Sequence, residues 1–215
     1  AGVAPARVAT IPLAIPAPDT GIDDPTEGAY IGYAGRFVPE KGVELLIEAC
    51  RRAKLPLRLA GDSLEHPAIR PGDDVECVPT PTPESLVEFY RGARVLVVAS
   101  LWEETFATVL SEAKSHGVPV IAPRIGAMPD LVKDEITGLL FETGNVEELT
   151  DKISRIWKDG ELCRRLGAAG RLDVQTDLNE DICFERHLKM YQQVVEESRD
   201  PKRKKNTDGS LIACD

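Results

Sequence analysis

Two glutamates, Glu104 and Glu112, are spaced in a way that suggests chemistry on one helix. They stand eight positions apart, a little over two turns of an α-helix. In a helix that includes both, the second carboxylate therefore lies on nearly the same face as the first, and we expect that face to be a ligand site. The alternative is an amphipathic helix in which Glu112 is solvated and Glu104 interacts with the dipole of the first turn.

The segment 104–107 stands at the start of this predicted helix, residues 105–116, where the first amide hydrogens lack acceptors. Such a helix start binds anions, and phosphate is its natural ligand. Glu112 lies further along and cannot bind phosphate, but a carboxylate is well suited to accept two hydrogen bonds from vicinal hydroxyls. At the other end, His116 is expected to end the helix and to favour its dipole.

A second candidate is the loop within residues 32–46, where a predicted strand ends at Gly35-Arg36 and a helix begins after Lys41-Gly42. Ligands bind at the carboxyl ends of strands in an open parallel sheet, and this Arg and Lys can hold an anion such as a diphosphate from two sides. The segment has neither the Walker A order nor G-x-G-x-x-G, which argues against a P-loop NTPase and a dinucleotide site. The alternative is that Gly35 is a turn residue and both cations are solvated.

These candidate sites belong to a repeating pattern of short apolar runs and amphipathic segments. Apolar runs bounded by Gly, Pro or Asp predict strands at 8–11, 29–34, 55–60, 75–78, 95–99, 118–122 and 139–141. Periodic segments predict helices at 43–53, 84–93, 105–116, 146–157, 161–172 and 182–197, and a short helix opens at Pro129-Asp130. From residue 29 onward, we therefore predict an α/β fold, a single Rossmann-like, doubly wound parallel sheet of about six strands with helices on both faces.

The composition narrows the function classes. A net charge of −10 argues against a sequence-independent nucleic-acid binder, because binding to phosphate backbones depends on clustered cations. The one basic run, 202–205, lies in a polar tail that we predict to be disordered; its alternative role is peripheral contact with anionic lipid at the inner face of the membrane. Five cysteines without CxxC spacing argue against a disulfide framework or zinc site. The sequence shows neither a long apolar run nor a signal-like leader, so we expect a cytoplasmic protein.

A set of motifs in a fixed order resembles a known family. G-R-x4-K-G follows one predicted strand and A-G-D the next; then come S-L-W-E-E-T-F-x-T-V-L-S-E-A-x3-G-x-P-V-I-A, G-A-M-P-D-L-V, T-G-L-L-F and R-R-L-G-A-A-G-R. This order resembles the C-terminal, donor-binding half of GT-B glycosyltransferases. It is most similar to the retaining enzymes marked by E-x7-E, the group 1 or family 4-like glycosyltransferases, and it covers roughly residues 7 to 197.

The resemblance implies a role for each candidate residue. Arg36 and Lys41, with Gly35 beside them, correspond to the pair that holds the donor diphosphate and stabilises the leaving nucleoside diphosphate. Glu112 corresponds to the glutamate that binds the ribose hydroxyls, and Glu104 to the one that contacts the donor sugar. The expected catalytic residues are therefore Arg36, Lys41 and Glu104.

Further donor contacts are implied on either side of these residues. The backbone of Phe106, Ala107, Thr108 and Val109 corresponds to the segment that holds phosphate and sugar oxygens, and Val78 and Pro79 fall where the nucleobase usually binds. No metal and no other cofactor is expected, because two cationic side chains and a helix start supply the positive charge that Mg²⁺ supplies elsewhere.

Three positions depart from the family pattern. The usual Phe-Gly, Gly-Gly and Asn-Gly pairs are replaced by Phe106-Ala107, Gly126-Ala127 and Leu13-Ala14. A methyl group at position 107 restricts close approach of the backbone to the donor. These departures concern the sugar pocket and a loop near the start of the chain. Arg36 and Lys41, the pair expected to hold the diphosphate, are unaffected.

The chain shows no counterpart of the N-terminal, acceptor-binding half of GT-B enzymes and begins with Ala rather than Met, so we expect it to be part of a longer enzyme. We predict a donor-binding domain at 1–198, with an opening segment and connector at 1–28, a core at 29–142 and C-terminal helices at 143–198, followed by a polar tail at 199–215. The expected partners are a nucleotide-sugar and the missing acceptor-binding domain or chain.

The predicted reaction moves a sugar from a nucleotide diphosphate to an acceptor hydroxyl with retained configuration. One alternative is a non-catalytic nucleotide-sugar-binding module that works with a separate acceptor-binding chain. Another is a different GT-B reaction, such as epimerisation or phosphorolysis, although the sequence shows no motif for the pyridoxal-phosphate lysine that such phosphorylases need. The residues specify neither the nucleobase, nor the sugar, nor the acceptor.

Overall fold

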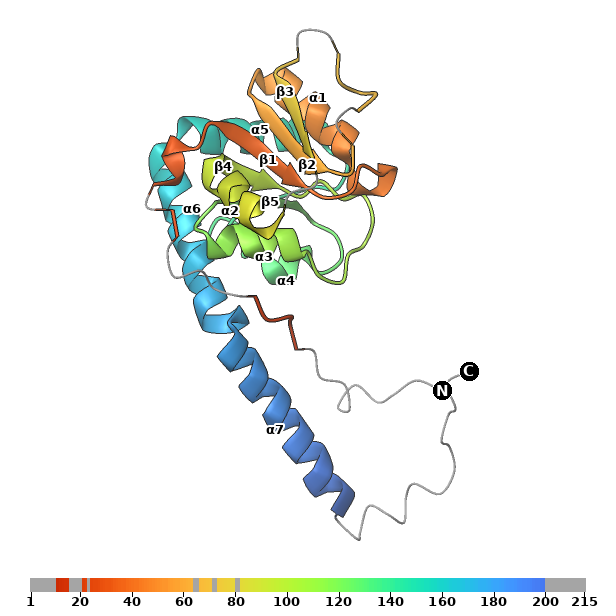
Figure 1. The fold of residues 1–215 in the computed structure, drawn as a ribbon, viewed down its shortest axis with the longest axis vertical. Coiled ribbons are helices and arrows are strands. Elements are labelled where there is room, and N and C mark those ends of the chain that lie inside the picture. Colours follow the sequence, from red (N-terminus) through yellow and green to blue (C-terminus); the bar gives the residue numbers. More distant parts are fainter. Residues whose placement is uncertain are drawn as a thin grey trace.

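The computed structural model describes residues 11–15, 21–22, 24–63, 66–70, 73–79 and 82–199, and it contains one parallel sheet (Figure 1). The six strands are β1 (Tyr30–Ala34), β2 (Leu57–Gly61), β3 (Val75–Pro79), β4 (Ala93–Val97), β5 (Val120–Pro123) and β6 (Leu139–Phe141). All neighbouring pairs are parallel, so the predicted sheet is confirmed.

The strand order β3-β2-β1-β4-β5-β6 makes the sheet doubly wound. From β1 the chain builds outward through β2 to β3, then returns to place β4 on the other side of β1 before continuing to β5 and β6. The side on which successive strands are added therefore changes between β1 and β4, which are parallel and pair through Gly32 and Leu96. The loops that leave these two strands diverge, and ligands of open α/β sheets bind in the resulting crevice.

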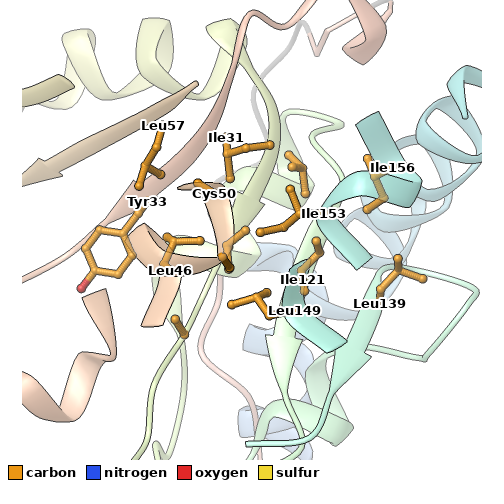
Figure 2. Close-up of a cluster of buried hydrophobic side chains, with 14 of the residues drawn as sticks. Ile31, Tyr33, Leu46, Cys50, Leu57, Ile121, Leu139, Leu149, Ile153 and Ile156 are labelled. Carbon is orange, nitrogen blue, oxygen red and sulfur yellow. The ribbon is translucent and has the colours of Figure 1, made fainter. Parts of the chain in front are cut away.

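Helices cover both faces of the sheet, as predicted. The helices α1 (Val43–Ala53), α5 (Val146–Lys158) and α6 (Gly160–Asp173) pack against one face, where Ile31, Leu46, Ile121 and Ile153 belong to a single buried cluster (Figure 2). On the other face lie α2 (Pro83–Gly92), α3 (Thr108–Ser115) and α4 (Met128–Leu131). Short helical turns occur at η2 (Pro25–Glu27), η3 (Pro39–Lys41) and η4 (Val174–Leu178), the last of which is a π-helical turn.

The last helix, α7 (Glu180–Arg199), continues away from the sheet after η4 (Figure 1). Several of its large apolar side chains are exposed, among them Phe184, Leu188, Tyr191 and Val194. Within the described part of the chain, no helix is long and apolar enough to cross a membrane.

The starts of α3 and α1 differ from those of α2, α5 and α6, because neither has a side-chain cap. Side-chain oxygens of Thr82, Asn145 and Asp159 accept hydrogen bonds from the first turns of α2, α5 and α6. Helix α3 instead begins after Ala107, whose methyl group has no polar atom to offer. The first turn of α3 is thus left without the side-chain acceptor that the other three helices have.

Several sequence predictions need adjustment. The helix predicted at 105–116 begins at Thr108, so Glu104 lies in the preceding loop and does not share a helical face with Glu112; that prediction is wrong. Strand and helix bounds elsewhere shift by two residues or fewer. Most of the predicted strand 8–11 and of the polar tail 199–215 lies outside the described residues, and the proposed division of the chain into segments stays a prediction.

Candidate functional site

A cavity of about 280 Å³ opens at the carboxyl ends of β1 and β4, where the sheet changes direction. Its wall is formed by the loop after β1, the loop after β4 and the start of α3. The structure brings eight of the predicted site residues together here: Gly35, Arg36, Lys41, Glu104, Phe106, Ala107, Thr108 and Val109. These residues come from two segments about 70 positions apart in the sequence. The parallel sheet brings the two segments together.

Lys41 and Glu104 form an ion pair across this cavity, with 3.0 Å between Lys41 Nζ and Glu104 Oε2. The other carboxylate oxygen, Oε1, accepts a hydrogen bond from the hydroxyl of Ser100. Both charged side chains remain partly exposed, at 29% for Lys41 and 17% for Glu104. Ion pairs of this exposure contribute at most about 1 kcal/mol, so a ligand that competes for either partner meets little resistance.

Gly35 and Arg36 shape the opposite rim. Gly35 has φ of +152°, a conformation that favours glycine, and a Cβ atom there would lie 3.1 Å from the hydroxyl oxygen of Tyr33. That hydroxyl donates to the carbonyl oxygen of Arg36 at 2.9 Å, which fixes the turn. Burial, with a smaller contribution from Glu104, raises the pKa of Tyr33 far above its ordinary value, so this donor keeps its proton. The Arg36 side chain is exposed at the rim.

The helix start contributes backbone donors. Because Ala107 offers no side-chain cap, the amides of Thr108 and Val109 in the first turn of α3 have no acceptor within the helix. Ala107 is itself buried, with φ of −104° and ψ of 87°, which a residue with a Cβ adopts without a left-handed conformation. The methyl group that replaces the usual glycine is therefore accommodated in the protein and does not strain the backbone.

The loop at Gly126-Ala127 holds the main chain of Glu104. The amide of Ala127 donates to the carbonyl oxygen of Glu104 at 3.0 Å. Gly126 has φ of +54°, and a Cβ atom there would lie 2.8 Å from both the amide nitrogen and the carbonyl oxygen of Glu104. Glycine is thus required at position 126, whereas alanine fits at 127.

Glu112 lies outside the cavity wall, further along α3. It is half-buried, and its Oε2 accepts a hydrogen bond from the Tyr90 hydroxyl at 2.7 Å. Burial and this bond raise the pKa of Tyr90 far above its ordinary value, so Tyr90 stays a donor. The remaining oxygen of Glu112 is the group that can accept from a further donor.

Val78, one of the two predicted nucleobase contacts, is not among the residues that line the cavity. Val78 and Pro79 end β3 and pair with Ala60 and Gly61 of β2, so they reach the same edge of the sheet two strands away from β1. Val78 is half-buried against the cluster that includes α2 and α3. The role of these two residues at the nucleobase stays a prediction.

Sequence reasoning missed three polar groups of this region. Tyr33, Ser100 and Tyr90 all bond to predicted site residues or their backbone. Ser100 follows a strand at its carboxyl end, a position that the strand prediction could have singled out. Tyr90 stands in the predicted helix 84–93, for which no ligand contact was predicted from the sequence, so no local signal indicated its hydrogen bond to Glu112.

Comparison with known proteins fits this geometry. The sequence profile described as "Glycosyl transferases group 1" matches residues 21–173. A curated relative, D-inositol 3-phosphate glycosyltransferase of Saccharomonospora viridis, is 33% identical over 153 residues, an alignment that covers 61% of this chain and 35% of the relative. The chain thus spans about a third of the length of that relative.

Solved structures place the same fold in one half of such enzymes. The C-terminal domain of a glycosyl transferase group 1 family protein (LpcC) from Francisella tularensis matches with a TM-score of 0.64 and 20% identity, over 75% of this chain and 96% of that domain. Anabaena HepE in complex with UDP and glucose matches with a TM-score of 0.64 and 20% identity, over 80% of this chain and 48% of HepE. The chain belongs to the glycosyl transferases group 1 family, and it has the Rossmann-like fold of the C-terminal domain of a GT-B enzyme.

Proposed function

We propose that this domain binds the nucleotide-sugar donor of a retaining hexosyltransferase, and that the remainder of the enzyme supplies the acceptor site. The observation that carries the proposal is the cavity between β1 and β4, which combines Arg36, Lys41 and the uncapped start of α3 with the carboxylate of Glu104. Two cations and a helix start attract a diphosphate, and a carboxylate beside them accepts hydrogen bonds from sugar hydroxyls.

The ion pair between Lys41 and Glu104 suggests how the donor enters. When a diphosphate arrives, Lys41 exchanges one oxygen of Glu104 for phosphate oxygens, which carry more negative charge. Glu104 is then free to accept hydrogen bonds from the sugar, while Ser100 and the Gly126 loop keep it in place. As the bond to the sugar breaks, charge develops on the leaving diphosphate, and Arg36 and Lys41 stabilise that charge.

We infer from the size of the cavity that the rest of the donor lies along the surface of α3. Ligand pockets usually enclose about 300–1,000 Å³, so a space of about 280 Å³ holds the diphosphate and part of the sugar but not a whole nucleotide-sugar. The nucleoside then lies along α3, where Glu112 accepts from the ribose hydroxyls, and extends toward Val78 and Pro79 at the end of β3.

The test is a calorimetric and thermal-shift panel of UDP, GDP, ADP and their sugars with the wild-type chain. UDP is the first ligand to try because HepE, which shares the fold, is in complex with UDP and glucose. A ligand at 100 times its dissociation constant is expected to add about 2.7 kcal/mol of stability. If none of these ligands shifts the wild type at millimolar concentration, the proposal is wrong.

Two variants separate the roles of the glutamates. Glu112→Gln is expected to weaken binding of the nucleoside diphosphate about tenfold, since a charged hydrogen-bond acceptor is lost. Glu104→Gln is expected to spare the diphosphate, because it releases Lys41, and to weaken only the nucleotide-sugar. Glu161→Gln, an exposed position in the first turn of α6, is the control. Equal binding by Glu112→Gln and wild type would show that the ribose role is wrong while the fold assignment stands.

A further inference from the structure

A lysine is completely buried behind the candidate site. Lys114 lies on α3, two positions after Glu112, and its side chain is 0% exposed. Its Nζ donates to the carbonyl oxygen of Leu131 at 2.8 Å and to Asp173 Oδ2 at 2.6 Å. Leu131 ends α4 and Asp173 ends α6, so a single ammonium group joins three helices.

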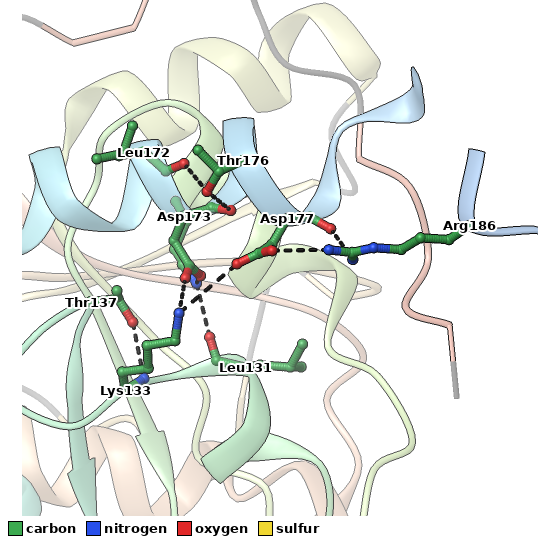
Figure 3. Close-up of polar contacts among 9 residues, drawn as sticks. Leu131, Lys133, Thr137, Leu172, Asp173, Thr176, Asp177 and Arg186 are labelled. Atoms are coloured by element: carbon green, nitrogen blue, oxygen red, sulfur yellow. Dashed lines mark hydrogen bonds and ion pairs between the residues drawn. The ribbon is translucent and has the colours of Figure 1, made fainter. Parts of the chain in front are cut away.

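The contact continues as a line of alternating charges (Figure 3). Asp173 Oδ1 accepts from Lys133 Nζ at 2.7 Å, and that ammonium also lies 4.0 Å from Asp177 Oδ2. Asp177 in the π-helical turn η4 accepts in turn from Arg186 of α7 at 3.0 Å. The line therefore runs from α3 through η4 to the first part of α7, with its buried end at Lys114.

Packing alone does not account for a charge at this position. Helix α6 approaches α3 closely through Gly170, where an added Cβ atom would lie 3.3 Å from Lys114 Cγ, and through Gly167 against the carbonyl oxygen of Gly117. An apolar side chain of similar length would fill the same space without the desolvation that an ammonium group undergoes. The hydrogen bonds of the ammonium group depend on geometry, so they form in only one arrangement of α3, α4 and α6 and oppose sliding of these helices.

Of these three helices, α3 begins at the wall of the cavity. Glu112 and Lys114 project from different faces of α3, since two helical positions differ by about 200°. On the first face Tyr90 holds Glu112, and on the second Asp173 and Leu131 hold Lys114. Helix α4 directly follows the loop whose Ala127 amide bonds to the carbonyl oxygen of Glu104.

We propose that Lys114 and Asp173 are positioning residues that set the spacing between Glu112, on α3, and Glu104, on the loop held by the segment before α4. The inference rests on the donor-binding function proposed above. A nucleotide-sugar must reach both glutamates at once, whereas a nucleoside diphosphate needs only Glu112 and the diphosphate contacts. Loss of the buried pair therefore weakens the nucleotide-sugar more than the nucleoside diphosphate.

The experiment compares dissociation constants by isothermal titration calorimetry for three ligand pairs: UDP and UDP-glucose, GDP and GDP-mannose, ADP and ADP-glucose. Lys114→Met is measured with the pair that the wild-type chain binds best. We expect about a tenfold loss for the nucleotide-sugar and about a twofold loss for its nucleoside diphosphate. Lys133→Met is the matched control, because it removes the 55% exposed partner of the same carboxylate, and both of its constants are expected to stay within about twofold of wild type.

Each other outcome overturns the inference in a distinguishable way. If the wild type binds none of the six ligands, the donor-binding function falls and the inference falls with it. If the wild type binds but Lys114→Met loses both members of the pair equally, or neither, the positioning role alone is wrong. If Lys114→Met does not fold, the double variant Lys114→Met/Asp173→Leu replaces it, because it leaves no unpaired charge in the buried position. The same greater loss of affinity for the nucleotide-sugar than for its nucleoside diphosphate is then expected.

Discussion

The two ends of helix α3 face opposite environments. At its start, no side-chain cap is present, Thr108 and Val109 line the cavity, and the neighbouring side chains of Lys41 and Glu104 are partly exposed. At its end, Lys114, Ser115 and His116 are all buried. The start of α3 therefore lies beside partly exposed charges, whereas its other end is fixed in the protein interior, an arrangement suited to a ligand site on a rigid element.

The buried end also corrects a prediction about His116. It is the C-cap residue of α3, but burial lowers its pKa, and the nearby Arg91 and Arg171 lower it further. A neutral imidazole gives no charge to favour the helix dipole near pH 7. The charge that fixes this end is that of Lys114. Burial lowers the pKa of Lys114, and the bond to Asp173 offsets part of that effect.

The strongest test of the fixed end is Asp173→Asn. The change leaves Lys114 buried without a countercharge, so we expect the free energy of unfolding to fall by about 4 kcal/mol in urea denaturation. Lys133→Met, which disturbs only the exposed partner of Asp173, is expected to cost less than about 1 kcal/mol. Similar losses for both variants would mean that the buried and exposed partners are equivalent, and the contrast between the ends of α3 would disappear.

The same comparison has a pH dependence. Burial raises the pKa of Asp173, but the hydrogen bonds from Lys114 and Lys133 outweigh it and leave the pKa below the ordinary 3.8. A carboxyl group with a depressed pKa contributes stability above its unfolded pKa, and that contribution is lost as the pH falls through the folded value. The difference in unfolding free energy between wild type and Asp173→Asn is therefore expected to shrink from about pH 5 downward. A difference that grows on acidification would contradict the ion pair.

Beside the cavity at the start of α3, the backbone of the loop after β1 is tightly packed even though the side chain of Lys41 is partly exposed. Gly42, which follows Lys41, has φ of +66°, and a Cβ atom there would lie 2.0 Å from the carbonyl oxygen of Ala99. We expect Gly42→Ala to lower the free energy of unfolding by about 3 kcal/mol. Gly144→Ala is the matched control, since Gly144 has φ of +80° with no heavy atom within 4 Å of the added Cβ, and it should cost about 1 kcal/mol. Equal costs in chemical denaturation would show that the loop can yield.

The sequence predicted the fold well because the signals for its elements are local. The apolar run 139–141 and the periodic segment 43–53 agree residue for residue with β6 and α1. The start of α3 was placed three residues early because the segment 105–107 continues the helical pattern. Its conformation is instead coupled to tertiary contacts of Glu104 with Lys41 and with the amide of Ala127, which no local pattern contains.

The site was partly predictable for the same reason. Motifs indicated Arg36, Lys41 and both glutamates, and the parallel sheet explains why loops distant in sequence meet. The pairing of Lys114 with Asp173 was not predictable, because the residues are 59 positions apart and a lysine in an amphipathic helix is usually solvated. Gly167 and Gly170, on one face of a predicted helix, were the available hint that two helices approach closely there.

The smallest expected effect concerns Tyr90 of α2, which contacts Glu112 in the middle of α3. Tyr90→Phe removes the hydrogen bond to Glu112, and we expect a loss of about 1 kcal/mol in stability and about a threefold weaker nucleoside diphosphate, since Glu112 loses its preset orientation. Tyr30→Phe is the matched control, because the Tyr30 hydroxyl donates to the carbonyl oxygen of Phe89 at 2.6 Å, and it should lower stability without changing affinity. If Tyr90→Phe binds more tightly than wild type, Tyr90 competes with the ribose for Glu112, and the middle of α3 belongs to the exchangeable end of the helix.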